Sequence, residues 1–343
     1  MENENRPPLI SIVLPTYNGV EAGLSASLAS CVAQTYKNFE LIVVNDGSTD
    51  ETEELVREWM AKDSRIRLLN HATNKNLPNA LNTGFAAATG DFLTWTSDDN
   101  RYWPEALQKM LDILQDKPDV AMVYCDYQRE VAAKNCDYTD GSICSVREQR
   151  DLIRDSAGVG ACFLYRQEVY QLLGDYNPEY FKAEDYEYWL RVSENFTMQP
   201  IHEVFYTYRF SAASMTGQGA TKVWDVANWR LRSQYAKSWR FYSNHEKASF
   251  YSTAAFNYRR ALRKSKATQE TSQEDGPEEK LHTQIQPISD ILLQAVKIAP
   301  FSFSTYYSFF RNLIKPLRRW LFRCSFRRNK KVFCVFGIYL VNR

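Results

Sequence analysis

The stretch FELIVVNDGSTDETEELVREWMAK, residues 39–62, decides the fold class of this chain. Its first part, FELIVV, is a short apolar run rich in branched residues, which is typical of a buried strand. The following STDETEELVREWMAK carries apolar residues at helical spacing, and Gly47 permits a tight turn between the two. A strand that leads directly into a helix is the repeating unit of a parallel α/β sheet.

The same alternation continues on both sides of this stretch. Further strand-like runs are LISIVL (9–14), RIRLL (65–69), DFLTW (91–95) and VAMVY (120–124). Further helix-like segments lie between them, at residues 21–34, 77–89 and 102–117. This order predicts a Rossmann-like α/β fold, in which a mostly parallel sheet is flanked by helices and ligands bind at the carboxyl ends of the strands.

The second half of the chain is less regular. Residues 125–160 are polar and irregular, and a second set of elements follows them: a strand and helix at 162–174, a helix at 183–196 and a strand at 203–210. Residues 222–266 read as one or two polar helices, and TQETSQEDGPEE (268–279) reads as an acidic linker.

Composition places the chain among folded proteins. It has 343 residues, of which 44% are apolar and 14% aromatic. Seven cysteines without a C-x-x-C pair fit reduced thiols in the cytosol and give no sign of structural zinc. The polar start MENENRPP is not a secretory signal, and the longest apolar run (332–341) is about half the ~20 residues of a membrane-spanning helix. We therefore expect a cytoplasmic protein.

Charge is distributed unevenly behind a formal net charge of +1, because residues 291–343 contain eleven Lys and Arg and no Asp or Glu. Apolar residues from Phe303 to Leu321 follow one helical face, although Pro316 should break or kink that helix. A basic, aromatic-rich amphipathic helix suits an anionic membrane surface, here the inner face of the cytoplasmic membrane. The alternative is a helix that packs on the rest of the chain. Nucleic-acid binding is not expected, because the aromatic residues repeat at helical spacing.

Two of the predicted strand ends carry residues suited to a nucleoside. LPTYN ends the first strand, where Pro15 and Tyr17 can present backbone groups and an aromatic edge. Asp46 ends the second strand, where its carboxylate can accept the imide N–H of a uracil or thymine ring. Taken singly, each segment fits a turn or a helix cap. Their meeting at one edge of the sheet favours a nucleotide site.

A third strand end, TSDDN (96–100), places Asp98 and Asp99 side by side. Neighbouring carboxylates repel, so a site that keeps both ionised usually supplies a cation. Hard oxygen ligands suit Mg²⁺ or Mn²⁺, either of which can bridge carboxylates to a nucleoside diphosphate. The alternative is an Asp-Asp turn that caps the next helix.

Four segments in this order resemble one known family: SIVLPTYNG (11–19), FELIVVNDGSTDET (39–52), ALNTGFAAATGDFLTWTSDDN (80–100) and AEDYEYWLR (183–191). Over about residues 8–215 the chain resembles the inverting glycosyltransferases of family 2, which have a GT-A fold. The resemblance implies transfer of a sugar from a nucleotide-diphosphate donor, most often a UDP-sugar, to a hydroxyl of a glycan or lipid-linked acceptor. It divides the chain into a catalytic domain (8–220), a helical extension (221–267), an acidic linker (268–280) and a basic amphipathic C-terminal tail (281–343).

The resemblance also implies roles for single residues. Pro15, Tyr17 and Asp46 match the positions that hold the nucleoside, and Asp98 matches the carboxylate near the ribose and sugar. Asp99 matches the ligand of Mn²⁺ or Mg²⁺ in a D-x-D-like motif.

Asp185 matches the catalytic base, and Glu184 lies beside it. An inverting displacement needs a carboxylate that faces the acceptor hydroxyl, opposite the leaving diphosphate. The alternative is that both acids only begin a helix, where the dipole favours them. Lys75 and Asn18 are further candidates for donor contacts, and His71 is another residue that could reach the diphosphate.

The chain departs from the family pattern at three positions. Thr96 stands where many relatives have an aspartate, Asn76 replaces a turn glycine, and Ser211 replaces a histidine. These departures leave the shape of the 74–76 loop and a histidine contact to metal or phosphate open. His202 is a lone histidine nearby, a kind that is more often a packed residue than a ligand.

Other classes fit less well. A dinucleotide-dependent oxidoreductase needs a G-x-G-x-x-G turn after the first strand, and LPTYNGVEAG does not supply it. No Gly-rich triphosphate loop of a nucleotidyltransferase is present, and KPLRRWL (315–321) lacks the Gln of the processive synthase segment. The remaining alternative is a catalytically silent sugar-nucleotide-binding or scaffold protein at the membrane, against which the retained acids argue.

Overall fold

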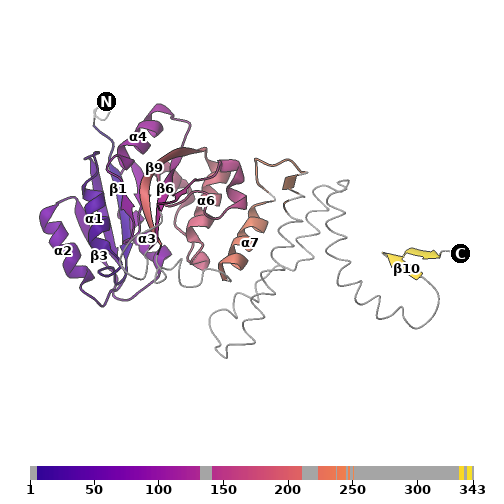
Figure 1. Ribbon diagram of the computed structural model, residues 1–343, viewed down its shortest axis with the longest axis horizontal. Coiled ribbons are helices and arrows are strands. Elements are labelled where there is room, and N and C mark those ends of the chain that lie inside the picture. Colours follow the sequence, from indigo (N-terminus) through magenta and orange to yellow (C-terminus); the bar gives the residue numbers. More distant parts are fainter. Residues whose placement is uncertain are drawn as a thin grey trace. The chain divides into compact units, whose positions relative to one another are not determined.

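The structure is a computed structural model that describes residues 6–131, 141–210, 223–236, 238–244, 246–247, 250, 332–335 and 338–341. The chain forms two units, Met1–Phe241 and Tyr242–Arg343 (Figure 1). The described part of the second unit includes an antiparallel hairpin of β10 (Val332–Val335) and β11 (Ile338–Val341). The described residues include no helix long and apolar enough to cross a membrane.

One nine-stranded sheet forms the centre of the first unit, with the strand order β3-β2-β1-β4-β8-β6-β9-β5 and β7 paired with β6. The strands are β1 (Ile10–Thr16), β2 (Phe39–Asn45), β3 (Ile66–Asn70), β4 (Phe92–Trp95), β5 (Arg101–Tyr102), β6 (Met122–Val131), β7 (Ile143–Cys144), β8 (Phe163–Arg166) and β9 (Met198–Phe210). The first four strands in this order run parallel to one another, and β8 is antiparallel to β4.

Helices connect the strands and cover both faces of the sheet. They are α1 (Leu24–Val32), α2 (Thr52–Lys62), α3 (Leu77–Ala86), α4 (Ala106–Asp116), α5 (Gln167–Leu173), α6 (Glu184–Asn195) and α7 (Val223–Tyr235), with short 3-10 helices η1 (Gln149–Arg154) and η2 (Pro178–Tyr180). In Figure 1 α2 lies at one end of the first unit, and α6 and α7 lie at the other. The predicted fold class, a mostly parallel sheet flanked by helices, is confirmed.

The alternation of side chains along β1 separates the two faces. Ile10, Ile12 and Leu14 point into a fully buried core that also takes in apolar residues of α1 and α4. Val13 points to the opposite face, where α3 approaches so closely that a Cβ at Gly84 would lie 2.3 Å from Val13 Cγ1. A strand buried on both faces explains why the run 9–14 is continuously apolar.

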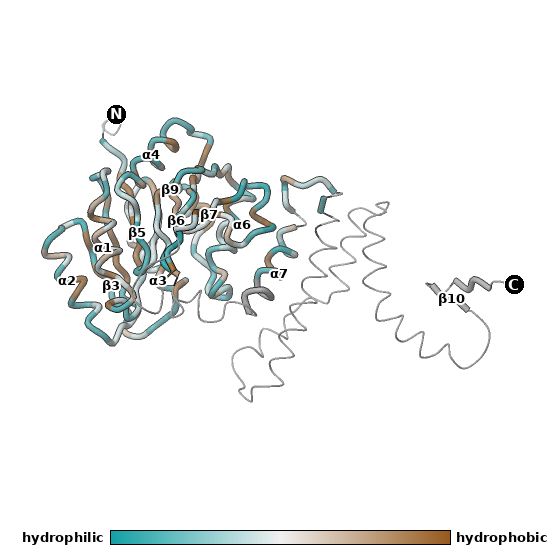
Figure 2. The backbone as a smooth tube through the Cα atoms, viewed as in Figure 1, coloured by the Kyte–Doolittle hydropathy of each residue, from teal (hydrophilic) through white to brown (hydrophobic). Residues whose placement is uncertain are grey.

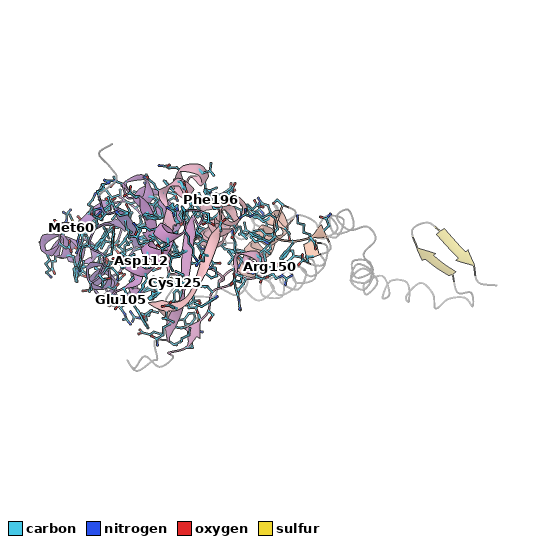
Figure 3. All side chains as sticks on the ribbon, turned by 90° about the horizontal axis from the view of Figure 1, so that it is seen from above. Met60, Glu105, Asp112, Cys125, Arg150 and Phe196 are labelled. Carbon is cyan, nitrogen blue, oxygen red and sulfur yellow. The ribbon has the colours of Figure 1, made fainter. Side chains whose placement is uncertain are left out.

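The figures show the same layering. In Figure 2 hydrophobic colour is concentrated along the inner strands, and hydrophilic colour lies on the outer turns of α2. In Figure 3 Met60 of α2 and Arg150 of η1 lie toward opposite ends of the first unit, and Cys125 of β6 lies between them among packed side chains. The sheet is therefore enclosed, and its strand ends are the places where polar groups can gather.

Two features differ from the sequence-based expectation. Residues 125–160 were expected to be irregular, but β6 continues to Val131 because β9 and β7 pair with it on its two sides. The strand predicted at 203–210 begins earlier, at Met198, since its first residues pair with Met122–Cys125. Of the predicted extension 221–267, the structure describes α7 and a few residues beyond it. The acidic linker 268–280, and the amphipathic stretch 303–321 within the predicted tail, lie outside the described residues.

Candidate active site

The register of the parallel strands brings the predicted site residues to one edge of the sheet. Thr16 pairs with Asn45 where β1 and β2 end, and Val13 pairs with Trp95, the last residue of β4. The backbone N–H of Asp46 donates to the carbonyl of Thr16 at 2.8 Å, so the segments that leave β1 and β2 still lie side by side one residue beyond β2. The segments that contain Pro15, Tyr17, Asp46, Asp98 and Asp99 therefore leave neighbouring strands at the same edge.

Asp46 is buried, with 4% of its surface exposed. Its Oδ1 accepts the backbone N–H of Lys75 at 2.9 Å and lies 2.6 Å from Nδ1 of His71. Nε2 of His71 lies 2.9 Å from Oγ1 of Thr83. Because both ring nitrogens of His71 already have protein partners, the imidazole has no nitrogen left for a diphosphate.

Lys75 therefore reaches Asp46 through its backbone, and the residue itself is exposed. Asn76, which follows it, has φ 71° and ψ 159°. This conformation is one that glycine adopts far more easily than any other residue, so the asparagine keeps the shape that the usual turn glycine would give.

The loops after β1 and β2 are tied to each other. Asn18 adopts φ 52°, its backbone N–H donates to Ser48 Oγ at 2.9 Å, and its Oδ1 accepts the backbone N–H of Thr49 at 2.8 Å. The side-chain oxygen of Asn18 thus holds the two loops together, and its side-chain amide nitrogen is the group left to contact a nucleotide-sugar donor. Pro15 is buried at the end of β1, whereas Tyr17 is 47% exposed, as an aromatic edge beside a base would need to be.

Asp98 and Asp99 follow β4. Oδ2 of Asp98 accepts the hydroxyl of Thr16 at 2.7 Å, and burial raises the pKa of Asp98 above its usual value in spite of this hydrogen bond. Burial, and then the charge of Asp98, raise the pKa of Asp99 to about 7, while the guanidinium of Arg209 acts in the opposite direction. Each acid is thus costly to ionise without added positive charge.

This pair fits a divalent cation. Two adjacent half-buried carboxylates supply the hard oxygen donors that Mg²⁺ and Mn²⁺ prefer, and their mutual repulsion is what a cation would offset. Gly19 packs closely against the hydrogen-bonded pair of Thr16 and Asp98, because a Cβ there would lie 2.2 Å from Thr16 Oγ1 and 2.9 Å from Asp98 Oδ2. Within the described residues no group of three or more His, Cys, Asp or Glu side chains could hold a metal, so further ligands would come from phosphate oxygens and water.

Asp185 and Glu184 begin α6, where acids favour the helix dipole. Oδ1 of Asp185 accepts the backbone N–H of Tyr186 at 2.6 Å. Burial raises the pKa of Asp185 to about 6, and burial together with the charge of Asp185 raises the pKa of Glu184 to about 8. Oε2 of Glu184 is buried, and the described residues offer it no hydrogen-bond partner. The two buried acids therefore do not both ionise readily at neutral pH.

Tyr176 connects the start of α6 with the end of β4. Its hydroxyl accepts the indole N–H of Trp95 at 3.1 Å, and its ring stacks on that of Tyr188 in α6, with the ring centroids 4.2 Å apart. Tyr176 is held in turn by Asn82, which accepts its backbone N–H and donates to its carbonyl, both at 2.8 Å. Tyr176 thus packs between the end of β4 and the helix that Asp185 begins.

Several residues of the site were not predicted. Thr16 hydrogen-bonds Asp98, and Arg209 of β9 acts electrostatically on Asp99 while its Nη1 donates to the carbonyl of Ala22 at 2.5 Å. The parallel register would have indicated Thr16, which is the last residue of β1. Nothing local in the sequence marks Arg209, because its position depends on the pairing of β9 with β6.

The remaining departures from the family pattern are also explained in part. Thr96 is buried, and its Oγ1 lies 2.6 Å from the hydroxyl of Tyr206, so the position belongs to the core. His202 was expected to be packed, but its side chain is 54% exposed and lies 3.3 Å from Asp126 Oδ1. Ser211 lies outside the described residues.

The fold is of the GT-A type, and comparisons with known proteins indicate a glycosyltransferase. The family model of Glycosyl transferase family 2 matches residues 11–174. Residues 11–174 of the chain are therefore similar to glycosyltransferase family 2. The class and family expected from the four sequence segments are both confirmed.

Curated relatives are similar over most of the described part. An uncharacterized glycosyltransferase of Rickettsia prowazekii is 29% identical over 222 residues, which cover 61% of this chain and 66% of that protein. The UDP-Glc:alpha-D-GlcNAc-diphosphoundecaprenol beta-1,3-glucosyltransferase WfgD of Escherichia coli is 27% identical over 223 residues, which cover 64% of this chain and 85% of that protein.

Solved structures share the fold. S. aureus TarS 1-349 in complex with UDP-GlcNAc aligns with a TM-score of 0.61 at 15% identity, over 97% of this chain and 96% of that chain. Mannosyltransferase PcManGT from Pyrobaculum calidifontis, in complex with GDP-Man and Mn²⁺, aligns with a TM-score of 0.52 at 18% identity, over 93% of this chain and 88% of that chain. At such identities the likeness concerns the fold.

Proposed function

We propose that this protein transfers a sugar from a UDP-sugar to a hydroxyl of a glycan or lipid-linked acceptor, with inversion at the anomeric carbon. The observation that carries the proposal is the meeting of Asp46 and the Asp98–Asp99 pair at one edge of the sheet, with Asp185 at the start of α6, the helix that Tyr176 connects to Trp95 at the end of β4. The names of WfgD and of the TarS complex support a UDP-sugar donor, and that of WfgD supports a lipid-linked acceptor.

Each site residue would have its own role in binding the donor. Asp46, Pro15 and Tyr17 would hold the nucleoside, and Asp98 would lie near the ribose and sugar. Asp99, together with Asp98, would hold Mn²⁺ or Mg²⁺. Such an ion neutralises charge on the departing diphosphate when it is bound.

Asp185 would act as the general base. It would take the proton of the acceptor hydroxyl while that oxygen bonds to the anomeric carbon and the bond from this carbon to the diphosphate breaks. Burial raises its pKa to about 6, near the neutral range that suits a general base. Burial, and then the charge of Asp185, raise the pKa of Glu184 beside it, which disfavours a second negative charge in the site.

The test is a screen of nucleotide sugars for Mn²⁺-dependent protection against thermal unfolding, followed by transfer and hydrolysis assays with the best donor. Asp185→Asn should bind the donor as the wild type does, yet react about 10²- to 10⁴-fold more slowly, because a general base contributes that much. A variant that keeps the full rate would remove Asp185 from the mechanism. No protection by any UDP-sugar would refute the donor class.

A lipid-linked acceptor would require the protein to act at a membrane surface. Nine basic residues between 311 and 331 would hold the chain at an anionic membrane surface, where lipid-linked glycans present their hydroxyls. Flotation with anionic liposomes should carry the full chain but not a chain that ends at Glu270. Equal flotation of both would refute the membrane claim.

A further inference from the structure

His71 lies beside Asp46 as a consequence of strand register. Asn45 and Asn70 form the last residue pair of β2 and β3, and the backbone N–H of His71 donates to the carbonyl of Asn45 at 2.9 Å. The side chains of Asn45 and Asn70 hydrogen-bond each other at 3.0 Å, which fixes this end of the two strands. Asp46 and His71, the next residues along each strand, therefore meet without any flexible segment between them.

The imidazole of His71 is held at both ends. Nδ1 lies 2.6 Å from Oδ1 of Asp46, Nε2 lies 2.9 Å from Oγ1 of Thr83, and the side chain is only 5% exposed. Thr83 is itself anchored, because its hydroxyl donates to the carbonyl of Asn79 one turn earlier in α3 at 3.0 Å. Through these two contacts the ring holds the carboxylate of Asp46 at a fixed position relative to α3.

The two oxygens of Asp46 have different surroundings. Oδ1 accepts from His71 Nδ1 and from the backbone N–H of Lys75. Among the described residues, no hydrogen bond reaches Oδ2. A carboxylate fixed in this way has one oxygen committed to the protein and one available to a ligand.

We propose that His71 is a positioning residue that directs Oδ2 of Asp46 at the imide N–H of the donor base, and that it thereby selects uracil over cytosine. This inference rests on the proposed function, in which Asp46 holds the base. Uracil N3 carries a hydrogen that a carboxylate oxygen accepts, whereas cytosine N3 carries a lone pair that the same oxygen repels. Discrimination of this kind depends on where the oxygen is held, because a buried acceptor rejects a base that leaves it unpaired.

Two variants separate the contacts of the ring. In His71→Asn the side-chain amide nitrogen can take the place of Nδ1 and keep the hydrogen bond to Asp46. In His71→Gln the amide takes the place of Nε2, so the contact to Thr83 is kept and the contact to Asp46 is lost. A third variant, Thr83→Val, keeps the contact to Asp46 but removes the anchor of the ring.

The experiment is calorimetric titration of the full-length protein with UDP and with CDP in the presence of Mn²⁺. His71→Gln should bind UDP about tenfold more weakly, the equivalent of one lost charge-assisted hydrogen bond, with little change for CDP. The ratio of UDP to CDP affinity should therefore fall about tenfold. His71→Asn should keep most of the wild-type ratio, and Thr83→Val should lie between the two.

A purely structural role would give a different result. If the variants weaken UDP and CDP alike, or if His71→Gln keeps the wild-type ratio, His71 does not position Asp46 for the base. Asp46→Asn distinguishes this failure from failure of the proposed function. Loss of the UDP preference in Asp46→Asn alone would overturn only the role of His71, whereas an unchanged preference, or no UDP binding by the wild type, would overturn both.

Discussion

Gly47 connects Asp46 to the helix α2, and replacing it with alanine should damage both stability and nucleotide binding. The residue has φ 75°, in the left-handed region that favours glycine. A Cβ at this position would lie 2.6 Å from the carbonyl carbon of Thr73 and 2.7 Å from the backbone nitrogen of Asn74. Since both atoms belong to the backbone, the 73–75 loop must move to make room.

The magnitude follows from two contributions. A left-handed conformation costs an alanine about 1–2 kcal/mol of stability. Movement of the loop also takes the backbone N–H of Lys75 away from Asp46, and a hydrogen bond to a charged group contributes about 1.5–3 kcal/mol. We therefore expect Gly47→Ala to destabilise the fold by about 2.5–5 kcal/mol. UDP affinity should fall about tenfold or more, because Asp46 loses one of the two donors that hold it.

Gly174→Ala is the matched control. Gly174 also has a positive φ, 69°, but a Cβ there would have no atom within 4 Å. The control should lose stability through its backbone conformation alone, and its UDP affinity should equal that of the wild type. Urea unfolding and calorimetric titration with UDP measure the two effects. If Gly47→Ala binds UDP as tightly as Gly174→Ala does, the contact between Lys75 and Asp46 does not shape the nucleotide site.

Three further predictions concern titration and strain. Transfer needs ionised Asp185, and burial raises the pKa of this residue to about 6. The value of kcat/KM should therefore be constant above pH 6 and fall about tenfold per pH unit below it, and a profile that is flat down to pH 5 would contradict this. Burial raises the pKa of Glu184 from 4.5 to about 8, so protonated Glu184 favours folding and the wild type should lose stability as the pH rises between these values. In urea unfolding at pH 5 and pH 8, the free energy of unfolding of Glu184→Gln should fall less than that of the wild type, and an equal fall would contradict a buried acid. Asn76→Gly should raise stability by about 1 kcal/mol, since it relieves about 1–3 kcal/mol of backbone strain at φ 71° and ψ 159° but costs about 0.5–1 kcal/mol in the chain entropy that glycine loses on folding. A lower urea midpoint than that of the wild type would show that the asparagine is not strained.

Much of the fold was readable from the sequence because its signals are local. The runs 39–44 and 65–69 became β2 and β3 almost residue for residue, and the segment at 77–89 became α3. Strand ends are equally local, which is why Asp46, Asp98 and Asp99 could be chosen from their positions after apolar runs. The alternation of strand and helix then predicts that these strands run parallel, so that their carboxyl ends lie at one edge of the sheet.

The parts that were missed depend on contacts between distant segments. The polar half of β6, from Tyr127 to Val131, has no apolar pattern and is a strand because β7 and β9 pair with it. His71 was expected as a residue that could reach the diphosphate, but the register of β2 and β3 buries it against Asp46. The role of Asn18 as a tie between two loops likewise depends on Ser48 and Thr49, thirty residues away in the sequence. Side-chain partners of this kind cannot be read from spacing along the chain.

The central claim is that the acids at the strand ends bind a diphosphate through a divalent cation. Calorimetric titration of UDP into the wild type and into Asp99→Ala, each with Mn²⁺ and with EDTA, tests it most directly. The account predicts that Mn²⁺ tightens UDP binding to the wild type at least about tenfold and leaves Asp99→Ala almost unaffected. UDP binding that is equally tight in EDTA, or a response of Asp99→Ala equal to that of the wild type, would contradict it.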